Sequence, residues 1–229
     1  QVSGQPGSGF TIRVRGAGSN GSSEPIFIVD GLRMGGIESI NVNDIESVEV
    51  LKDAASAAIY GADGANGVVL ITTKSGAAAE PQLTYKYYYG IQQISNPDFS
   101  VMNSHDYLDY RWRAQLMEGR DSTQIAANLP LPGEETYSTN WLDEVINPAP
   151  MAEHFLSYSG GNEKSQYNAS ASYLTQDGIG GGDKANFTRF TARLSGNHQL
   201  KEWLTIGHKI NYTHSVRTSL PENSTFNSF

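Results

Sequence analysis

The sequence predicts a mixed α/β domain followed by a series of antiparallel β-strands. Residues 45–74 have the pattern of a strand, a short helix, a glycine-rich turn and a second strand. After residue 81, apolar and polar side chains alternate with a period of two in five separate segments, as strands with two different faces require. The 24 glycines and 12 tyrosines among 229 residues also suit many strands joined by turns.

Each part of residues 45–74 has its own local signal. Val48 and Val50 alternate with Glu46 and Glu49, which indicates the start of a strand. Asp53 is placed to cap a short alanine-rich helix. The other expected features are an apolar helix face at Ala55, Ala58 and Ile59, a helix end at Gly61, sharp turns at Gly64 and Gly67, and a strand buried on both faces at Val68–Ile71.

Two more strands are predicted upstream of this unit. Residues 10–15 alternate between apolar and polar side chains, which indicates a half-buried strand. Residues 26–29 form a short apolar run and predict a second strand. Asp30 and Gly31 mark a turn, and residues 32–39 are expected to form a loop.

Residues 16–21 form a G-x-G-x-x-G pattern directly after a predicted strand. Such a pattern binds a dinucleotide when its third glycine opens a helix whose N-terminus faces the pyrophosphate. Here residues 22–25 lead into another strand instead of a helix. We therefore interpret the pattern as a flexible loop and not as a nucleotide site.

The second half of the chain alternates first over residues 83–92 and then four more times. Short connections alternate with longer ones, which is typical of transmembrane barrels. A soluble sandwich shows the same alternation and is the commoner fold, so periodicity alone favours it. The polar faces carry Ser, Asn and Thr with little charge, as the wall of a water-filled lumen would. The later alternating segments lie near residues 156–159, 167–173, 189–195 and 204–213.

Residues 95–150 interrupt the alternation. Asn103 or Ser104 can cap a helix that carries Asp106 in its first turn and ends at Gly119. A connection of this length inside a domain is usually functional or disordered. The expected apolar face of the helix comprises Tyr107, Tyr110, Ala114 and Met117.

Composition excludes several classes of function. The formal net charge of −8 argues against nucleic-acid binding, which normally requires a basic face. Without cysteine there is no disulfide, no thiolate metal site and no cysteine nucleophile. The five histidines form no metal-binding pattern, and no catalytic constellation is found. We expect no enzyme activity, no metal and no cofactor. The histidines are His105, His154, His198, His208 and His214.

The stretch DIESVEVLKDAASAAIYGADGANGVVLITTKSG, residues 44–76, resembles the end of the plug domain of SusC/RagA-type TonB-dependent transporters. These proteins are outer-membrane importers of Gram-negative bacteria. The resemblance extends upstream through residues 12–16 and 25–31, and more loosely downstream through residues 157–161 and 177–178. It implies a mixed α/β plug domain followed by antiparallel strands of a large transmembrane β-barrel, which this chain does not complete.

The resemblance also implies a division of the chain. Residues 1–76 correspond to a plug domain, residues 77–82 to a linker, and residues 83–229 to the first five or so barrel strands, with a long extracellular loop at 95–150. A signal peptide, the segment gripped by TonB and the remaining strands are expected outside these residues. The aromatic residues expected at the membrane interface are Tyr85, Tyr158, Tyr173, Trp203 and Tyr212.

The function implied by the resemblance is TonB-dependent import of a nutrient, most often a glycan and sometimes an oligopeptide. Expected partners are a SusD-like surface lipoprotein that acts as a lid, TonB of the TonB–ExbB–ExbD system, and outer-membrane lipid. Two transporter–lipoprotein pairs can form a dimer in this family. The alternative is a soluble or surface-attached β-rich binding protein without transport activity.

The resemblance also suggests which residues face the ligand. The plug loops at residues 18–23 and 32–38 are expected to meet the substrate outside the cell. Arg15 is expected to latch the plug to the barrel by pairing with a wall carboxylate that lies outside this chain. The ligand-facing candidates are Ser19, Asn20, Ser22, Arg33 and Glu38.

Overall fold

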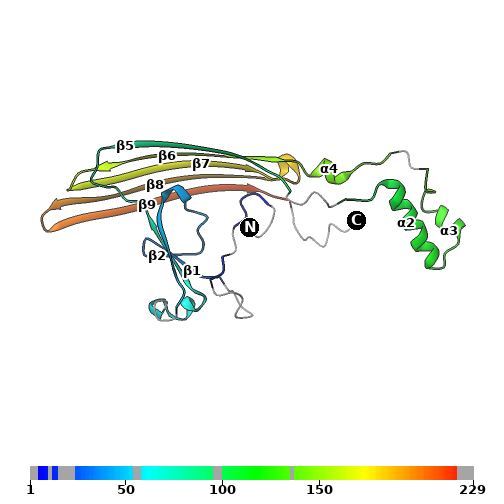
Figure 1. Ribbon diagram of the computed structural model, residues 1–229, viewed down its shortest axis with the longest axis horizontal. Helices are drawn as coiled ribbons and strands as arrows, with labels where there is room; N and C mark the ends of the chain where they lie inside the picture. The colour runs from blue at the N-terminus through cyan, green and yellow to red at the C-terminus, as the bar shows by residue number, and fades with distance from the viewer. Residues whose placement is uncertain are drawn as a thin grey trace.

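A computed structural model of the chain describes residues 5–9, 12–14, 24–53, 58–94, 100–134 and 137–220. These residues contain two β-sheets (Figure 1). The first, called here the small sheet, has four strands in the order β2-β1-β4-β3. The second, called the long sheet, has five strands in the order β5-β6-β7-β8-β9. The strands of the small sheet are β1 (Ile26–Val29), β2 (Leu32–Met34), β3 (Ile45–Leu51) and β4 (Val68–Thr73).

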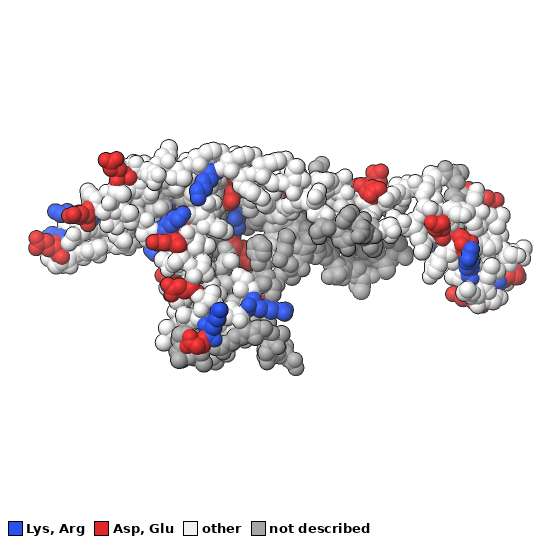
Figure 2. Space-filling model, in the orientation of Figure 1, with Lys and Arg blue, Asp and Glu red and all other residues white. Residues whose placement is uncertain are grey.

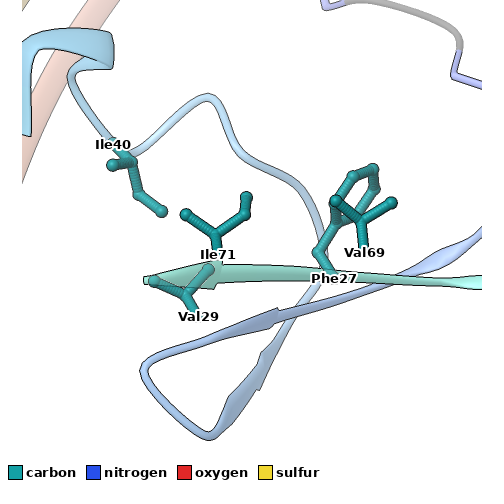
Figure 3. Close-up of a cluster of buried hydrophobic side chains, with 5 residues drawn as sticks. All are labelled: Phe27, Val29, Ile40, Val69 and Ile71. Carbon is teal, nitrogen blue, oxygen red and sulfur yellow. The ribbon is translucent and has the colours of Figure 1, made fainter. Parts of the chain in front are cut away.

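The small sheet is organised around β4, which pairs in parallel with β1 and antiparallel with β3. Val68, Val69 and Ile71 on this strand are almost fully buried. The prediction of a strand covered on both faces is therefore confirmed. On one face, Val69 and Ile71 pack with side chains from β1 and from the loop after β2 (Figure 3). Those partners are Phe27, Val29 and Ile40.

The loop expected at residues 32–39 is partly a strand, and the prediction is wrong for Leu32–Met34. Asp30 and Gly31 have φ angles of 49° and 87°, which are the left-handed values of a two-residue hairpin turn. This turn aligns Val29 with Leu32, so the chain returns at once to pair with β1.

Residues 12–14 were expected to lie in a strand, but they form none. Ile12 and Val14 nevertheless pack against the small-sheet core, while Arg13 is exposed. The alternation therefore predicted correctly that Ile12 and Val14 are half-buried and Arg13 is exposed, although none of the described strands pairs with these three residues. Residues 10, 11 and 15, which complete the predicted strand, lie outside the described part.

The described part of the alanine-rich helix is a 3₁₀ segment, η2 (Ala58–Asn66), which is kinked at Gly61. Gly61 has a φ of 70°, so it breaks the helix as expected, but a second 3₁₀ turn follows it. Ile59, which was expected on the apolar face of the helix, is 79% exposed. A 3₁₀ segment stacks every third side chain and cannot present the broad apolar face of an α-helix. Residues 54–57, including Ala55, lie outside the described part.

The long sheet is an antiparallel meander in which each strand pairs with its neighbours in sequence. All five predicted strands are present, but β6 to β9 are longer than the alternating segments. Pairing continues through positions where the alternation is interrupted, because backbone hydrogen bonds do not depend on side-chain polarity. The strands are β5 (Gln82–Gln92), β6 (Ala149–Gly161), β7 (Ser165–Asp177), β8 (Asn186–Lys201) and β9 (Leu204–Thr218).

The two faces of the long sheet differ in polarity. The inner face, which is turned toward the small sheet, carries buried polar side chains that include Asn168, Ser170 and Ser195. The outer face carries exposed apolar side chains. In the view of Figure 2, charged residues gather at one end of the long sheet, over the small sheet and over the helices, and most of the remaining surface is uncharged. Four of the five predicted interfacial aromatics lie on this outer face and Trp203 lies in the turn before β9. Leu83, Tyr85, Ile91, Leu156, Tyr158, Tyr173, Phe190, Leu194, Ile206, Ile210 and Tyr212 belong to the exposed apolar set.

Among the described residues between β5 and β6, three helices lie beyond one end of the long sheet (Figure 1). Asn103 caps α2 as predicted, with its side chain accepting from the Asp106 amide at 2.8 Å. Gly119 follows the helix with a φ of 83°. No helix among the described residues is long and apolar enough to cross a bilayer. The helices are α2 (Ser104–Met117), α3 (Ser122–Ala126) and α4 (Trp141–Val145).

The expected apolar face of α2 is wrong. Tyr107, Tyr110 and Met117 are exposed, whereas Leu108 and Trp112 are buried. The reason is tertiary: α2 packs on the side that faces α3, where Ile125 is fully buried and the Trp112 Nε1 donates to the Pro130 carbonyl at 2.6 Å.

Candidate functional site

The small sheet meets the inner face of the long sheet through polar groups, and this interface is the candidate functional site. The two backbones come close where the chain leaves β4. A Cβ atom on Gly76 would lie 2.1 Å from the Tyr167 amide nitrogen of β7, so this approach requires glycine. The closeness brings the end of β4 and the turn after β1 against strands β7 to β9.

The centre of the interface is the Asp30 cluster, formed by Asp30, Thr73, Arg193 and Lys209. The Asp30 carboxylate accepts hydrogen bonds from the Thr73 amide at 3.1 Å and from the Thr73 hydroxyl at 2.5 Å. Arg193 Nη2 of β8 lies 3.0 Å from it, and Lys209 Nζ of β9 lies 2.7 Å from it. Arg193 also donates to the Thr73 hydroxyl.

Most of this cluster is removed from solvent. The Arg193 and Asp30 side chains are 5% and 10% exposed, while Lys209 remains 40% exposed. Burial by itself raises the pKa of Asp30, but hydrogen bonds from Lys209, from both donors of Thr73 and from Arg193 outweigh this effect. Together they lower the pKa to about 2. Asp30 is therefore ionised at any pH that a cell surface normally meets.

A second buried carboxylate has a different environment. Asp44, in η1 (Val42–Asp44), is 4% exposed and accepts from the Ser170 hydroxyl of β7 at 2.6 Å. Burial raises its pKa above the ordinary value, and the Ser170 hydrogen bond and the charges of Arg193 and Lys74 only partly oppose this rise. The same interface thus stabilises one carboxylate as an anion and destabilises the charge of the other.

The loop between β2 and β3 adds further contacts with the inner face. Asn41 Nδ2 donates to Glu153 of β6 at 2.7 Å. Arg189 Nη1 of β8 donates to the Glu38 carbonyl at 2.7 Å. Thr213 of β9 donates to the Ser39 carbonyl at 2.8 Å. These bonds connect one loop to three strands, so a displacement of the loop must break several hydrogen bonds at once.

The structure separates the two ligand-facing candidates that it describes. Arg33 forms an exposed ion pair with Asp63 of η2 at 2.5 Å. Glu38 lies beside Arg189 and Phe187 in a cavity against the long sheet. Ser19, Asn20, Ser22 and the latch residue Arg15 fall outside the described residues, so their roles stay predictions.

The described ion pair also differs in polarity from the predicted latch. The expected latch has an arginine on the plug and a carboxylate on the wall, whereas here the small sheet supplies Asp30 and the long sheet supplies Arg193 and Lys209. Sequence reasoning missed these residues. A usable signal existed, because Arg193 is a full charge on a strand face composed otherwise mainly of hydroxyl and amide side chains.

Other candidate sites are not supported by the part of the chain that the structure describes. It contains no group of three or more His, Asp or Glu side chains that could hold a metal ion. The G-x-G-x-x-G pattern lies outside the described residues. Residues 24 and 25 after it are irregular, and β1 begins at Ile26, so no helix opens there to bind a pyrophosphate.

Comparison with known protein families finds a match over residues 1–68 to the TonB-dependent receptor plug domain. Among curated relatives, the TonB-dependent receptor P26 of Formosa agariphila is 36% identical over 93% of this chain and 22% of its own length. The TonB-dependent receptor SusC of Bacteroides thetaiotaomicron is 32% identical over 84% of this chain and 19% of its own length.

Solved structures agree with the sequence comparisons. The RagAB peptide importer in its open-open state matches with a TM-score of 0.79 and 30% identity, over 95% of this chain and 27% of that chain. Its closed-closed state matches with a TM-score of 0.74 and 31% identity, over 88% of this chain and 25% of that chain. The chain thus spans between about a fifth and a quarter of the length of these relatives.

Proposed function

The chain belongs to the SusC/RagA-type TonB-dependent transporters, and on this premise we propose that its protein imports a nutrient across the outer membrane of a Gram-negative bacterium. In this proposal the small sheet is part of the plug, and the long sheet is part of the barrel wall. The plug blocks the lumen at rest and is displaced when TonB pulls on it.

The observation that carries this proposal is the polar character of the contact between the sheets. Asp30, Arg193 and Lys209 form a buried ionic contact, surrounded by hydrogen bonds to serine, threonine and asparagine. Hydrogen bonds and ion pairs can be replaced by bonds to water when a plug moves and channel water enters. An interface made of apolar side chains would resist such wetting, as the interior of the small sheet does.

The outer face of the long sheet supports a membrane location over the soluble alternative. Its exposed apolar residues form a continuous surface across five strands. Monomeric soluble proteins rarely leave an apolar surface of that extent in contact with water. In a barrel the same residues face lipid.

The partners follow from the family. We propose a SusD-like lipoprotein as the lid on the extracellular side, where residues 95–150 would lie, and TonB of the TonB–ExbB–ExbD system on the periplasmic side. A glycan or an oligopeptide is the proposed nutrient, and a pair of such complexes is the proposed assembly. No nucleotide or redox cofactor is needed, because energy coupling is mechanical.

Uptake measurements in cells can test this proposal. A strain lacking the gene is compared with strains that carry the unaltered transporter with and without TonB, using labelled oligosaccharide and oligopeptide mixtures. We expect uptake of one mixture that requires both the transporter and TonB. Equal uptake without TonB, or recovery of the protein in the soluble fraction without detergent, would contradict the proposal.

The predicted latch can be tested in the same system. Arg15→Ala is expected to raise the passive conductance of the transporter in planar bilayers, because the plug would be held less firmly. Unchanged conductance would show that Arg15 does not act as a latch. It would leave the contacts observed in the Asp30 cluster unchallenged.

A further inference from the structure

The inner face of the long sheet carries few charged side chains, and most of them are positive. Among the described residues, one carboxylate and five cations of this sheet hydrogen-bond to the small sheet and the segments beside it. The chain as a whole has a formal net charge of −8, so this face departs from the average. The carboxylate is Glu153, and the cations are Lys86, Arg189, Arg193, Lys209 and Arg217.

Four of these cations form a file along the neighbouring strands β8 and β9. The pairing of the strands places Arg217 level with residue 187 and Lys209 level with residue 195, and Arg189 and Arg193 lie between these levels. At about 3.3 Å per residue, the file is roughly 26 Å long. A strand tilt of about 40° reduces this to roughly 20 Å across the membrane, which is most of the apolar band of a barrel. We call these four residues the cation file.

Each member of the cation file has an acceptor on the opposite side of the interface. Arg217 donates to the Gly7 carbonyl. Arg189 Nη1 donates to the Glu38 carbonyl at 2.7 Å. The other two cations share the Asp30 carboxylate. The acceptors therefore come from three separate segments, and all of these segments lie on the plug side in the proposed transporter.

Displacement of the plug would remove these acceptors together. In the proposed transporter, the space that the plug leaves is the passage for the nutrient. The cation file would then line one wall of that passage, and the carboxylate of Asp30 would leave with the plug. Arginine and lysine side chains that line a water-filled pore attract anions and select for them.

Attachment of the plug does not by itself require charged donors along the whole file. On the same two strands, Ser195, Asn211 and Thr213 donate to carbonyl groups of the plug side without carrying a charge. Arg189 and Arg217 also donate to carbonyl groups, which a hydroxyl or amide could equally bind. Their positive charge is therefore better explained by what they meet once the plug has moved.

We propose that the cation file is a track for anionic groups of the nutrient, and that the imported molecule carries carboxylate, sulfate or phosphate groups. The proposal rests on the proposed import function and adds a charge requirement to it. An acidic glycan and an acidic peptide can both meet this requirement. At rest, the Asp30 carboxylate occupies the position on Arg193 and Lys209 that an anionic group of the nutrient takes during passage.

Ion selectivity tests the file without an identified nutrient. The intact transporter is reconstituted in planar bilayers under a gradient of KCl, at a urea concentration that opens the plugged pore reversibly. The reversal potential gives the permeability ratio of chloride to potassium. The variants are Arg189→Gln and Arg217→Gln, which leave the Asp30 cluster intact. Lys201→Gln is the matched control, because Lys201 ends β8 outside the file and lies over the Trp203 ring.

We expect each file variant to lower the chloride-to-potassium ratio about twofold, which is the effect of one unit charge about 10 Å away across water. The double variant should lower it about fourfold. Arg217→Lys restores the charge and should restore the ratio. Lys201→Gln should leave the ratio unchanged, because salt at the mouth of the pore screens its charge. Single-channel conductance of normal size verifies that each pore is folded, and an unchanged ratio in a folded double variant overturns the proposal.

Uptake in cells distinguishes the two sources of anionic groups. The probes are an oligogalacturonate and its neutral methyl ester, and a glutamate-rich peptide and its glutamine-rich counterpart. We expect TonB-dependent uptake of one acidic probe to exceed that of its neutral counterpart, and the double variant to lower this uptake about fourfold. The acidic probe that enters identifies the source as a glycan or a peptide.

The same uptake measurements separate the cation file from the import function. TonB-dependent uptake confined to the neutral probes would overturn the track and leave import standing. Uptake of all probes that rises in the double variant without TonB would show that the two arginines only hold the plug, which also overturns the track. Absence of TonB-dependent uptake for every probe would contradict import, while the ion selectivity still decides whether the file attracts anions.

Discussion

The two sheets of this chain bury different mixtures of side chains, mainly apolar in the small sheet and largely polar in the long sheet. In the small sheet, Val68, Val69 and Ile71 are almost inaccessible to solvent, as in the core of a soluble protein. In the long sheet, the buried side chains include serine, threonine, asparagine and arginine beside Phe155 and Phe187, while most leucines, isoleucines and tyrosines are exposed. Both sheets use the same backbone hydrogen bonds, so the difference is entirely one of side-chain placement.

This contrast shows how a single chain can be built for two solvents. The small sheet gains its stability from removing apolar surface from water. The long sheet gains little in that way within this chain, because its apolar face remains exposed. A lipid bilayer would cover the apolar side chains of that face, and a polar plug would give hydrogen-bond partners to the polar side chains of the other face. The following variants test this difference, in the intact transporter.

A buried charge should separate the two sheets most strongly. Val68→Asp places a carboxylate in the core of the small sheet, and we expect it to lower the unfolding free energy of that sheet by more than about 4 kcal/mol. Leu194→Asp on the outer face of the long sheet should cost less than the about 2–4 kcal/mol reported for a cation at the bilayer midplane. Hydrogen exchange of the two sheets measures both effects, and equal losses would contradict the contrast.

Removal of the central cation should have the next largest effect. Arg193→Ala leaves Asp30 buried with Lys209 and Thr73 only, and we expect a loss of about 3 kcal/mol in the docking of the small sheet. Faster protease cleavage of the plug and higher passive conductance are the measurements. Arg193→Lys keeps the positive charge, so its cleavage rate and its conductance should lie between those of the unaltered protein and those of Arg193→Ala. If alanine and lysine behave like the unaltered protein, the Asp30 cluster does not hold the sheets together.

The two buried carboxylates should respond to pH with opposite signs. The pKa of Asp30 is lowered, so its contribution is complete above the ordinary pKa of 3.8 and is lost as pH falls toward about 2. The pKa of Asp44 is raised, so its contribution is complete below 3.8 and is lost as pH rises through the raised value.

A matched pair of amide variants makes this difference measurable. At neutral pH, Asp30→Asn should destabilise the docked small sheet by about 2 kcal/mol, because it loses hydrogen bonds from charged donors. Asp44→Asn should leave the stability unchanged or raise it, because it removes a charge that burial disfavours. Thermal unfolding at a series of pH values decides the matter, and the same loss in both variants would refute the assigned environments.

The smallest effect is expected at the exposed ion pair. The Arg33 and Asp63 side chains are 60% and 57% exposed, so water and salt screen their attraction. Arg33→Ala should therefore change the stability of the small sheet by less than about 1 kcal/mol. A larger loss in thermal unfolding would show that Arg33 has a structural role beyond this pair.

Local sequence patterns predicted most helices and strands, but they did not always predict which side of an element is buried against its neighbours. The period of two identified all five strands of the long sheet, and the side chain of Asn103 marked the start of α2. The same patterns failed where a neighbour decides which side is covered, as in α2, where Leu108 and Trp112 are buried instead of Tyr107 and Tyr110. The short strand β2 was missed because three residues carry too little periodicity.

The sequence by itself determined the two kinds of sheet and the family resemblance, because alternation, apolar runs and a long ungapped match are local properties of the chain. Only the tertiary structure decided which charges meet. Asp30 and Arg193 are 163 residues apart in the chain, and no local pattern relates them. The cavity beside Glu38 likewise depends on a loop of the small sheet lying against β5 to β8. Burial and hydrogen bonding arise from such distant neighbours, and they determine the charge state and the chemistry of each site.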